Sequence, residues 1–244
     1  MPCFYTPELK EQDAEITISG EGYHHIIDVF RKSNGAEILL TNGNGLLAKA
    51  KILSINKKNL TVSILSINKK KQSQTKIAVA FSILKNKHDF MIIEKLTELG
   101  IKEFFPIFTD RTIRKPSKNT IIKFKKTAVA AIKQCDNAFL PKVNITTSLT
   151  EFLGNIKENY KPVVALEAGE NRQLWEVLSS LNEESICLII GPEGGFSQEE
   201  IEIFMNKNIQ TFSLGNHIVR AETAAIAASA QLVGYFLKEN PEYY

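Results

Sequence analysis

Two glycine-containing segments in the last quarter of the chain most restrict how it can fold. Each follows a short apolar run and leads into a helix-forming stretch, namely Gly191-Pro-Glu-Gly-Gly-Phe196 and Leu214-Gly-Asn-His-Ile-Val-Arg220. A short apolar run bounded by glycine is typical of a buried strand. Ser197 followed by Glu200 predicts a capping box at a helix N-terminus. Because strand-to-helix corners let main chain close on a ligand, the sequence predicts an α/β fold with a pocket shared by both corners.

The residues in these corners limit the kind of ligand. Neither corner contains the Gly-x-Gly-x-x-Gly dinucleotide fingerprint or the Gly-Lys-Ser/Thr of a phosphate loop. Glu193 stands among the glycines, where it would repel a phosphate and suit a ligand that carries positive charge. An isolated loop of this kind can equally serve only as a tight turn, and the residues alone leave both interpretations open.

Strand and helix patterns alternate from residue 77 onward. Strands are expected at 77–81, 104–108, 162–166, 186–190 and 211–214. Helices are expected at 88–99 (ended by Gly100), from a Ser117 cap to Cys135, and at 171–181, 197–206 and 221–238. This alternation is typical of a parallel sheet covered by helices.

The first 70 residues have a different pattern, in which strands are joined by tight turns. Asn42-Gly-Asn-Gly45 lies between two strand patterns and is a strong hairpin signal, and residues 56–59 form a second turn. Short strands with few helices predict a small β-barrel. The polar stretch 68–76 is the expected linker. We therefore expect two domains, residues 1–70 and 77–244.

Charge is distributed unevenly along the chain, although the net charge is only +3. Residues 75–150 contain 14 Lys and Arg against 6 Asp and Glu, whereas residues 151–244 contain 6 against 14. Seven basic residues lie between positions 111 and 126. This density favours a contact surface for a polyanion such as RNA. Lysine-rich helix faces are often merely solvated, and that alternative stays open.

Several classes of protein do not fit the sequence. Cys3, Cys135 and Cys187 are scattered without metal-ligand spacing, which favours a reducing compartment and predicts neither disulfides nor zinc. No apolar run approaches the roughly 18 residues that span a membrane, and the N-terminus lacks the pattern of a signal peptide. We expect a cytoplasmic protein without a metal and without membrane contact.

Both glycine segments resemble the signature loops of a known family. The stretches 191–200 and 214–225 are similar to those of the RsmE family of small-subunit ribosomal RNA methyltransferases, within the SPOUT superfamily. His25–Arg31, Lys95–Gly100 and 128–135 also fall in the family's order and spacing. The resemblance covers nearly the whole chain. It implies a C-terminal SPOUT-type knotted parallel α/β domain, preceded by a small PUA-like β-barrel that docks RNA, in a cytosolic homodimer.

The resemblance also implies an activity and a site. The family methylates N3 of one uridine in 16S rRNA with S-adenosyl-L-methionine as cofactor. The implied cofactor-binding residues are Leu166, Glu167, Gly191, Pro192, Glu193, Gly194, Leu214, Gly215, Ile218, Val219, Arg220 and Thr223. Arg220 and Glu222 are the candidate catalytic residues. Charge and resemblance together make Arg31, Arg111, Arg114, Lys123, Lys126 and Gln134 the candidates for substrate binding.

Other roles for these residues remain open at this point. Arg220 could simply pair with Glu193 or Glu222, and Glu222 suits the first turn of a helix on dipole grounds alone. The alanine-rich stretch 221–230 could be a buried helix or the homodimer interface. The alternatives for the whole protein are another SPOUT RNA methyltransferase with a different target and a non-catalytic ribosome-assembly protein that binds RNA.

Two departures from the family pattern concern RNA contacts. The family commonly has Gly-Arg after the Gln-Cys pair, where this chain has Asp136-Asn137. The family also often has an arginine near the N-terminus, where this chain has Met1-Pro-Cys-Phe4. Both changes weaken the expected RNA contacts more than the expected cofactor contacts.

Overall fold

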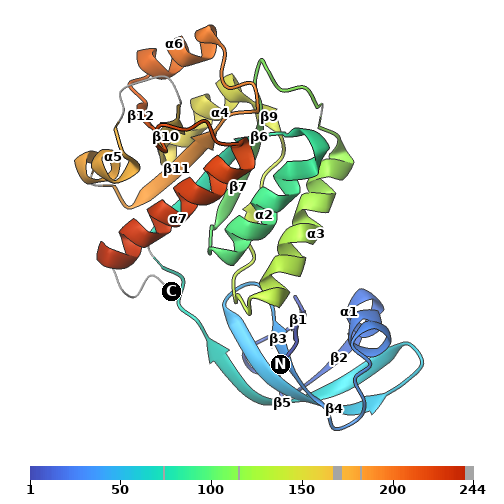
Figure 1. The fold of residues 1–244 in the computed structure, drawn as a ribbon. Helices are drawn as coiled ribbons and strands as arrows, with labels where there is room; N and C mark the ends of the chain where they lie inside the picture. The colour runs from blue at the N-terminus through green and yellow to red at the C-terminus, as the bar shows by residue number, and fades with distance from the viewer. Residues whose placement is uncertain (74, 115, 167–171, 182, 240–244) are drawn as a thin grey trace. The chain divides into compact units, whose positions relative to one another are not determined.

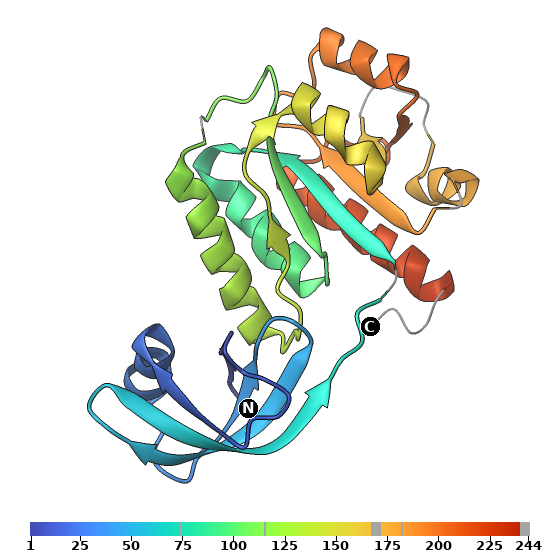
Figure 2. The same ribbon diagram turned by 180° about the vertical axis from the view of Figure 1, so that it is seen from behind.

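The computed structural model describes residues 1–73, 75–114, 116–166, 172–181 and 183–239. The chain forms two compact units, drawn in Figure 1 and, from behind, in Figure 2. The first consists of Met1–Gln72 and Val129–Leu140, and the second of Ser73–Ala128 and the chain from Pro141 onward. The first unit thus includes a segment from the region where we expected the second domain, 77–244.

The first unit is built on a five-stranded sheet with the order β1-β3-β4-β5-β2. Its strands are β1 (Cys3–Tyr5), β2 (Glu15–Ser19), β3 (Glu37–Thr41), β4 (Leu46–Ile55) and β5 (Asn59–Lys69). The predicted hairpin is confirmed, since β3 and β4 pair antiparallel around a turn in which Asn42 Oδ1 accepts from two main-chain N–H groups. β4 and β5 are longer than expected, and two register shifts in their pairing bend the sheet.

A helical segment covers the core of the first unit. The helix α1 (Gly20–His24) continues into a π-helical turn, η1 (His25–Val29), and Ile26 in that turn is fully buried. Beneath it, alternate residues of β4 and β5 point inward, among them Ala50, Ile52 and Val62. Neither α1 nor η1 was predicted, because this segment is too short to display a helical period.

The second unit contains a parallel sheet with the order β12-β10-β11-β6-β7-β8, in which β9 also pairs with β7. Its strands are β6 (Lys76–Ser82), β7 (Glu103–Phe108), β8 (Lys142–Val143), β9 (Thr147–Ser148), β10 (Lys161–Ala165), β11 (Ser185–Ile190) and β12 (Gln210–Phe212). β6 is central, and its residues from Ile77 to Ser82 are completely buried. Burial on both faces explains the uninterrupted apolar runs in the sequence. The predicted α/β class is confirmed.

Helices cover both faces of this sheet (Figure 1, Figure 2). They are α2 (His88–Glu98), α3 (Lys118–Gln134), α4 (Leu149–Asn155), α5 (Leu174–Leu181), α6 (Gln198–Asn206) and α7 (Ala221–Glu239), with short 3-10 turns η2 (Lys85–Lys87) and η3 (Ile156–Glu158). Phe152 of α4 and Phe204 of α6 pack on the face of β6 that carries Ala78 and Ala80. Phe81, from the opposite face, packs against Phe124 of α3.

Two predicted boundaries are confirmed in detail. Gly100 ends α2 with φ of +77°, a left-handed conformation that glycine adopts freely. Ser197 and Glu200 form the reciprocal capping box at the start of α6. Because the strands of the second unit run parallel, the loops after β6, β7, β10, β11 and β12 all leave from one edge of the sheet. Within the described part of the chain, no helix is both long and apolar enough to cross a membrane.

Candidate cofactor and substrate site

A pocket of about 720 Å³ opens at this carboxyl edge of the sheet in the second unit. Its walls are the ends of β10, β11 and β12 together with the first turns of α6 and α7. Among its lining residues are Leu166, Gly191, Pro192, Glu193, Gly194, Leu214, Gly215, Ile218, Val219 and Arg220. Crevices outside the carboxyl ends of strands are the usual ligand sites of parallel sheets. The structure therefore brings both glycine corners into one cavity.

The first corner is a tight turn closed by its own main chain. The Gly195 N–H donates to the Pro192 carbonyl at 2.9 Å, and Gly195 has φ of +68°. Gly191 is needed for a different reason. A Cβ added there would lie 2.9 Å from Cε2 of Phe196, whose buried ring packs 4.9 Å from that of Phe204. The absence of a side chain at Gly191 thus keeps the loop against its supporting aromatic ring.

The second corner is held by a serine hydroxyl. Ser213 Oγ accepts from the Gly215 N–H at 3.2 Å and donates to the Gly215 carbonyl at 3.1 Å. Gly215 has φ of +123°, and a Cβ there would meet nothing within 4 Å. Ile218 is 83% exposed, so this loop presents an apolar side chain to solvent. The Arg220 carbonyl then accepts from the Ala224 N–H and begins α7.

A buried carboxylate lies immediately beyond the pocket, in the first turn of α7. Glu222 Oε1 is 2.7 Å from Nδ1 of His88, the first residue of α2, and the Glu222 side chain is only 10% exposed. Burial by itself would raise the pKa of Glu222. The hydrogen bond with His88 and the charge of Arg220 oppose this effect and hold the pKa below its usual value of 4.5. Glu222 is therefore ionised at neutral pH.

Arg220 itself is exposed at the mouth of the pocket. Among the residues that the structure describes, no carboxylate lies within ion-pair distance of its guanidinium, so it does not form the pair with Glu193 or Glu222 considered from the sequence. Glu193 instead accepts from the Lys85 main-chain N–H at 2.8 Å. The arginine is available to a ligand.

Comparison with known proteins places this site in a family. A family model described as an RNA methyltransferase domain matches residues 71–233, and one described as an RNA methyltransferase PUA domain matches residues 18–65. The ribosomal RNA small subunit methyltransferase E of Bacillus subtilis is 31% identical over 92% of this chain and 93% of its own. That of Rickettsia conorii is also 31% identical, over 93% of each chain. This chain belongs to the ribosomal RNA small subunit methyltransferase E family.

Solved structures agree with this membership. A putative methyltransferase of Legionella pneumophila, solved in complex with its bound cofactor SAM, is 28% identical over 95% of this chain and 96% of its own, with a TM-score of 0.81. The methyltransferase E of Neisseria gonorrhoeae, bound to S-adenosyl methionine, is 23% identical over the same shares, with a TM-score of 0.86. At 23% identity, the Neisseria structure supports the fold alone.

One predicted cofactor residue does not line the pocket. Thr223 is exposed on α7 and is not among the residues around the cavity. The predicted Glu167 lies outside the described residues. Conversely, Arg111, which we predicted to bind substrate, lines the pocket and donates through Nη1 to the Gly194 carbonyl at 2.7 Å. Arg111 thus belongs to the glycine corner as much as to the basic stretch.

The loop after β7 is joined to the glycine corner by a second set of bonds. Ser197 Oγ donates to Asp110 Oδ2 at 2.6 Å, and the Asp110 N–H donates to Glu200 Oε1 at 3.0 Å. Glu200 is almost completely buried. The capping box of α6 therefore also fixes the loop that carries Arg111.

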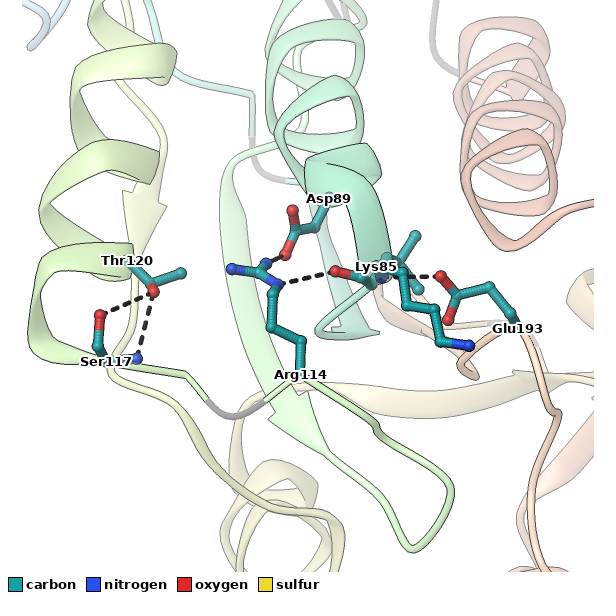
Figure 3. A network of polar contacts seen from close by, with 7 residues as sticks. Lys85, Asp89, Arg114, Ser117, Thr120 and Glu193 are labelled. Carbon is teal, nitrogen blue, oxygen red and sulfur yellow. Dashed lines mark hydrogen bonds and ion pairs between the residues drawn. The ribbon is translucent and has the colours of Figure 1, made fainter.

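Arg114 occupies an internal network, shown in Figure 3. Its Nε donates to the Leu84 carbonyl at 2.8 Å, and its Nη2 pairs with Asp89, whose side chain is completely buried. Burial lowers the pKa of Arg114, and the charge of Glu193 opposes that change. The guanidinium that we predicted to contact RNA is thus largely engaged within the second unit.

The remaining predicted substrate residues are on the surface. Lys123 and Lys126 are exposed along the part of α3 that belongs to the second unit. Arg31 and Gln134 are exposed on the first unit. His/Cys/Asp/Glu clusters able to hold a metal do not occur among the described residues. Cys187 is fully buried, and burial raises its thiol pKa.

Sequence reasoning missed His88 and Asp89, which begin α2. One signal was available, since a histidine and an aspartate follow the carboxyl end of the central strand β6 within a few residues, where ligand sites in parallel sheets gather. The pairing partners, Glu222 and Arg114, are remote in sequence, and no local pattern reveals them.

Proposed function

We propose that this protein methylates N3 of a uridine in the 16S rRNA of the small ribosomal subunit, with S-adenosyl-L-methionine as methyl donor. The observation that carries the proposal is the pocket formed by two glycine corners, in a chain that belongs to the methyltransferase E family. The Legionella relative, whose structure contains SAM, supports the choice of cofactor.

The pocket has the size and chemistry that this cofactor needs. Its volume of about 720 Å³ is within the range of small-molecule sites. Main-chain groups of Gly191, Gly194, Leu214 and Gly215 would hold the nucleoside, and Leu166 would pack against it. When bound, the cofactor supplies an electrophilic methyl group attached to a positively charged sulfur. The contribution of the chain is to orient the uracil ring so that N3 faces that methyl.

Arg220 and Glu222 have distinct roles in this proposal. N3 of uracil carries a proton that has to leave as the methyl bond forms, and negative charge develops on the ring. Arg220, exposed at the mouth of the pocket, stabilises that charge. The ionised Glu222 and its partner His88 form the proton acceptor, in which the carboxylate orients the imidazole.

The pKa of Glu222 allows a test that does not depend on activity. Because the pKa is lowered in the folded protein, the contribution of Glu222 to stability is fully present above pH 4.5 and is lost as the pH falls through the folded-state pKa. We expect Glu222→Gln to reduce the free energy of unfolding by about 1 kcal/mol at neutral pH and by less in acid. Urea unfolding across this pH range measures both; an equal difference at every pH would contradict the ionised pair.

We further propose that the protein is a cytoplasmic homodimer that assembles through α7. Thr223, Ala230 and Gly234 are exposed small residues on this helix, and Ile218 is exposed on the loop before it. Small residues let a second helix approach closely. Light scattering of the purified protein tests the dimer, and Ala230→Arg should convert it to monomers. A monomeric wild-type protein would end this part of the proposal.

The decisive experiment maps modified nucleosides by mass spectrometry in 16S rRNA from cells with and without the gene. We expect a single 3-methyluridine to disappear with the gene and to return when purified protein and S-adenosyl-L-methionine are added to subunits. If a different methylated nucleoside were lost, the protein would still be an RNA methyltransferase, but N3 of uridine would not be its target. An unchanged rRNA would overturn the enzyme.

A further inference from the structure

One aromatic side chain in the first unit is rigidly held yet open to solvent. Phe30 is 45% exposed, although its ring makes T-shaped contacts with Phe4 at 5.3 Å and with His25 at 5.0 Å. Phe4 and His25 also contact each other edge to face at 5.7 Å. A side chain that served only the core would be turned inward, as Phe4 is at 1% exposure. The three rings instead fix Phe30 at the surface.

The backbone that presents Phe30 is unusual. The residues from His25 to Val29 form a π-helical turn, in which the Phe30 N–H donates to the His25 carbonyl at 3.0 Å. Arg31 follows with φ of +50°, a left-handed conformation that is costly for a residue with a long side chain. π-helical turns and strained residues both concentrate at functional sites. Two separate backbone features therefore coincide at the exposed ring.

Basic residues follow Phe30 in the chain, and another contacts the histidine that packs on its ring. Arg31 is exposed and Lys32 half-buried directly after Phe30, and Lys133 Nζ lies 3.4 Å from Nδ1 of His25. The carboxylates nearby are Glu21 and Asp28, and Asp28 is paired with His24. A phosphate on the Arg31 side of the ring would meet positive charge.

The modest charge of the whole unit indicates what kind of contact is needed. Residues 1–72 and 129–140 together carry eleven Lys and Arg against eight Asp and Glu. An excess of three charges gives a weak attraction for a polyanion, because RNA affinity grows with the number of phosphates neutralised. Stacking of one base on an aromatic ring contributes as much as several such contacts and works on any unpaired base. An exposed, rigid ring beside an arginine supplies that contribution.

We propose that Phe30 and Arg31 form a nucleotide-binding site for an unpaired residue of the substrate RNA, with the base stacked on Phe30 and its phosphate on Arg31. The inference rests on the proposed function, because it takes RNA as the substrate. It goes further by assigning a specific base contact to the segment matched by the PUA family model, residues 18–65.

A fluorescent reporter tests the stacking directly. The chain has one tryptophan, Trp175, which is 60% exposed on α5. In the full-length double variant Phe30→Trp, Trp175→Phe, the only indole occupies the proposed site. We expect a short single-stranded oligouridylate to quench this fluorescence, and a duplex of the same length to quench it far less. The wild-type protein, in which Trp175 is the reporter, is the matched control and should not respond.

Binding measurements separate the two residues. Phe30→Leu keeps apolar bulk but removes the ring, and should weaken oligouridylate binding about tenfold without changing its salt dependence. Arg31→Gln should lower the slope of log K against log salt by about one. Trp175→Leu should change neither. Melting temperatures confirm that each variant is folded.

Three results would overturn the proposal. They are wild-type RNA affinity in Phe30→Leu, absence of quenching at residue 30, and a change of oligomeric state in Phe30→Leu with unchanged RNA affinity, which would make the ring a protein contact. Calorimetry with S-adenosyl-L-methionine distinguishes these results from failure of the proposed function. If the wild-type protein bound the cofactor but RNA did not quench the indole at residue 30, only the proposed nucleotide-binding site would be wrong. If the wild-type protein did not bind the cofactor, the proposed methyltransferase function would be wrong.

Discussion

The pocket and the basic stretch 111–126, both in the second unit, offer different groups to a ligand. The pocket is lined by both glycine corners, and at Gly191, Gly194 and Gly215 only main chain can face a ligand because these residues have no side chain. The basic stretch offers long side chains, but not all of them are available. Arg114 donates to Leu84 and Asp89 inside the protein, whereas Lys123 and Lys126 are exposed.

This difference separates two kinds of recognition. A small ligand of fixed shape is held by backbone geometry, and that geometry depends on a few glycines whose replacement has a specific steric cost. A polymer is held by many charges that act almost independently, so each contributes little. Basic residues counted in a sequence include both charges that face a ligand and charges that hold loops together. Burial and hydrogen bonding distinguish them.

The largest effect is expected at Arg114. Arg114→Gln leaves the Asp89 carboxylate buried without its cation, while Asp89 Oδ1 already has no partner among the described residues. We expect the free energy of unfolding to fall by about 3 kcal/mol, measured by urea unfolding. Adding Asp89→Asn to the Arg114→Gln variant should restore part of the lost free energy of unfolding. Arg111→Gln, in the same loop, is the control and should cost less than about 1 kcal/mol. If Arg114→Gln were fully stable but bound RNA weakly, the basic stretch would be a uniform RNA surface.

Gly191→Ala tests the main-chain side of the comparison. The added Cβ would lie 2.9 Å from the buried Phe196 ring, which cannot move freely because Phe204 packs against it. We expect the affinity for S-adenosyl-L-methionine to fall at least tenfold, or about 1.4 kcal/mol, by calorimetry. Gly154→Ala, in α4, is the matched control because a Cβ there meets nothing within 4 Å. Unchanged affinity in Gly191→Ala would show that the corner does not contact the cofactor.

Arg220 is the one charged side chain of the pocket to which we assign a catalytic role. Arg220→Ala should leave the melting temperature unchanged, because the described residues give its guanidinium no ion pair, and should slow methyl transfer about tenfold or more, equivalent to about 1.4 kcal/mol of barrier. Single-turnover methylation of small subunits measures the rate, and Lys238→Ala, in the last turn of α7, is the control. A wild-type rate would remove Arg220 from the mechanism.

The smallest effect per residue is expected for the exposed lysines of α3. Changing Lys123, Lys125 and Lys126 together to Gln should flatten the salt dependence of RNA binding by roughly two units of slope, with little change in stability. Lys161→Gln with Lys238→Gln serves as the control. Filter binding at several salt concentrations gives the slopes. If the triple variant kept the wild-type slope, these lysines would be only a solvated helix face.

Much of the fold was predictable because local chemistry specified it. The buried strands β6 and β11, the Gly100 stop and the Ser197 capping box are each encoded within a few residues, and all are confirmed. The short strands β1, β2, β8 and β9 were missed because their pairing partners, not their own residues, make them strands. The π-helical turn η1 has no sequence period that distinguishes it from an α-helix.

The candidate site was predictable only in part for the same reason. Of the eleven described residues predicted to bind cofactor, ten line the pocket. Nine of these ten belong to the two glycine segments, and Leu166 follows β10. The pairs His88–Glu222 and Asp89–Arg114 join segments that are distant in sequence and could not be inferred. At Asp136, where the family commonly has glycine, φ is +52°. Aspartate is one of the few other residues that adopt this conformation readily, which explains the substitution.

The bond between His88 and Glu222 has a consequence for synthesis of the protein. The two residues are 134 positions apart, and the sheet of the second unit combines strands from the beginning, middle and end of that unit. A growing polypeptide that has emerged from the ribosome only as far as β11 has neither the second glycine corner nor the carboxylate. A complete pocket therefore requires translation to have passed the first turn of α7. Assembly from such distant contacts makes folding slow compared with that of a helical protein of similar length.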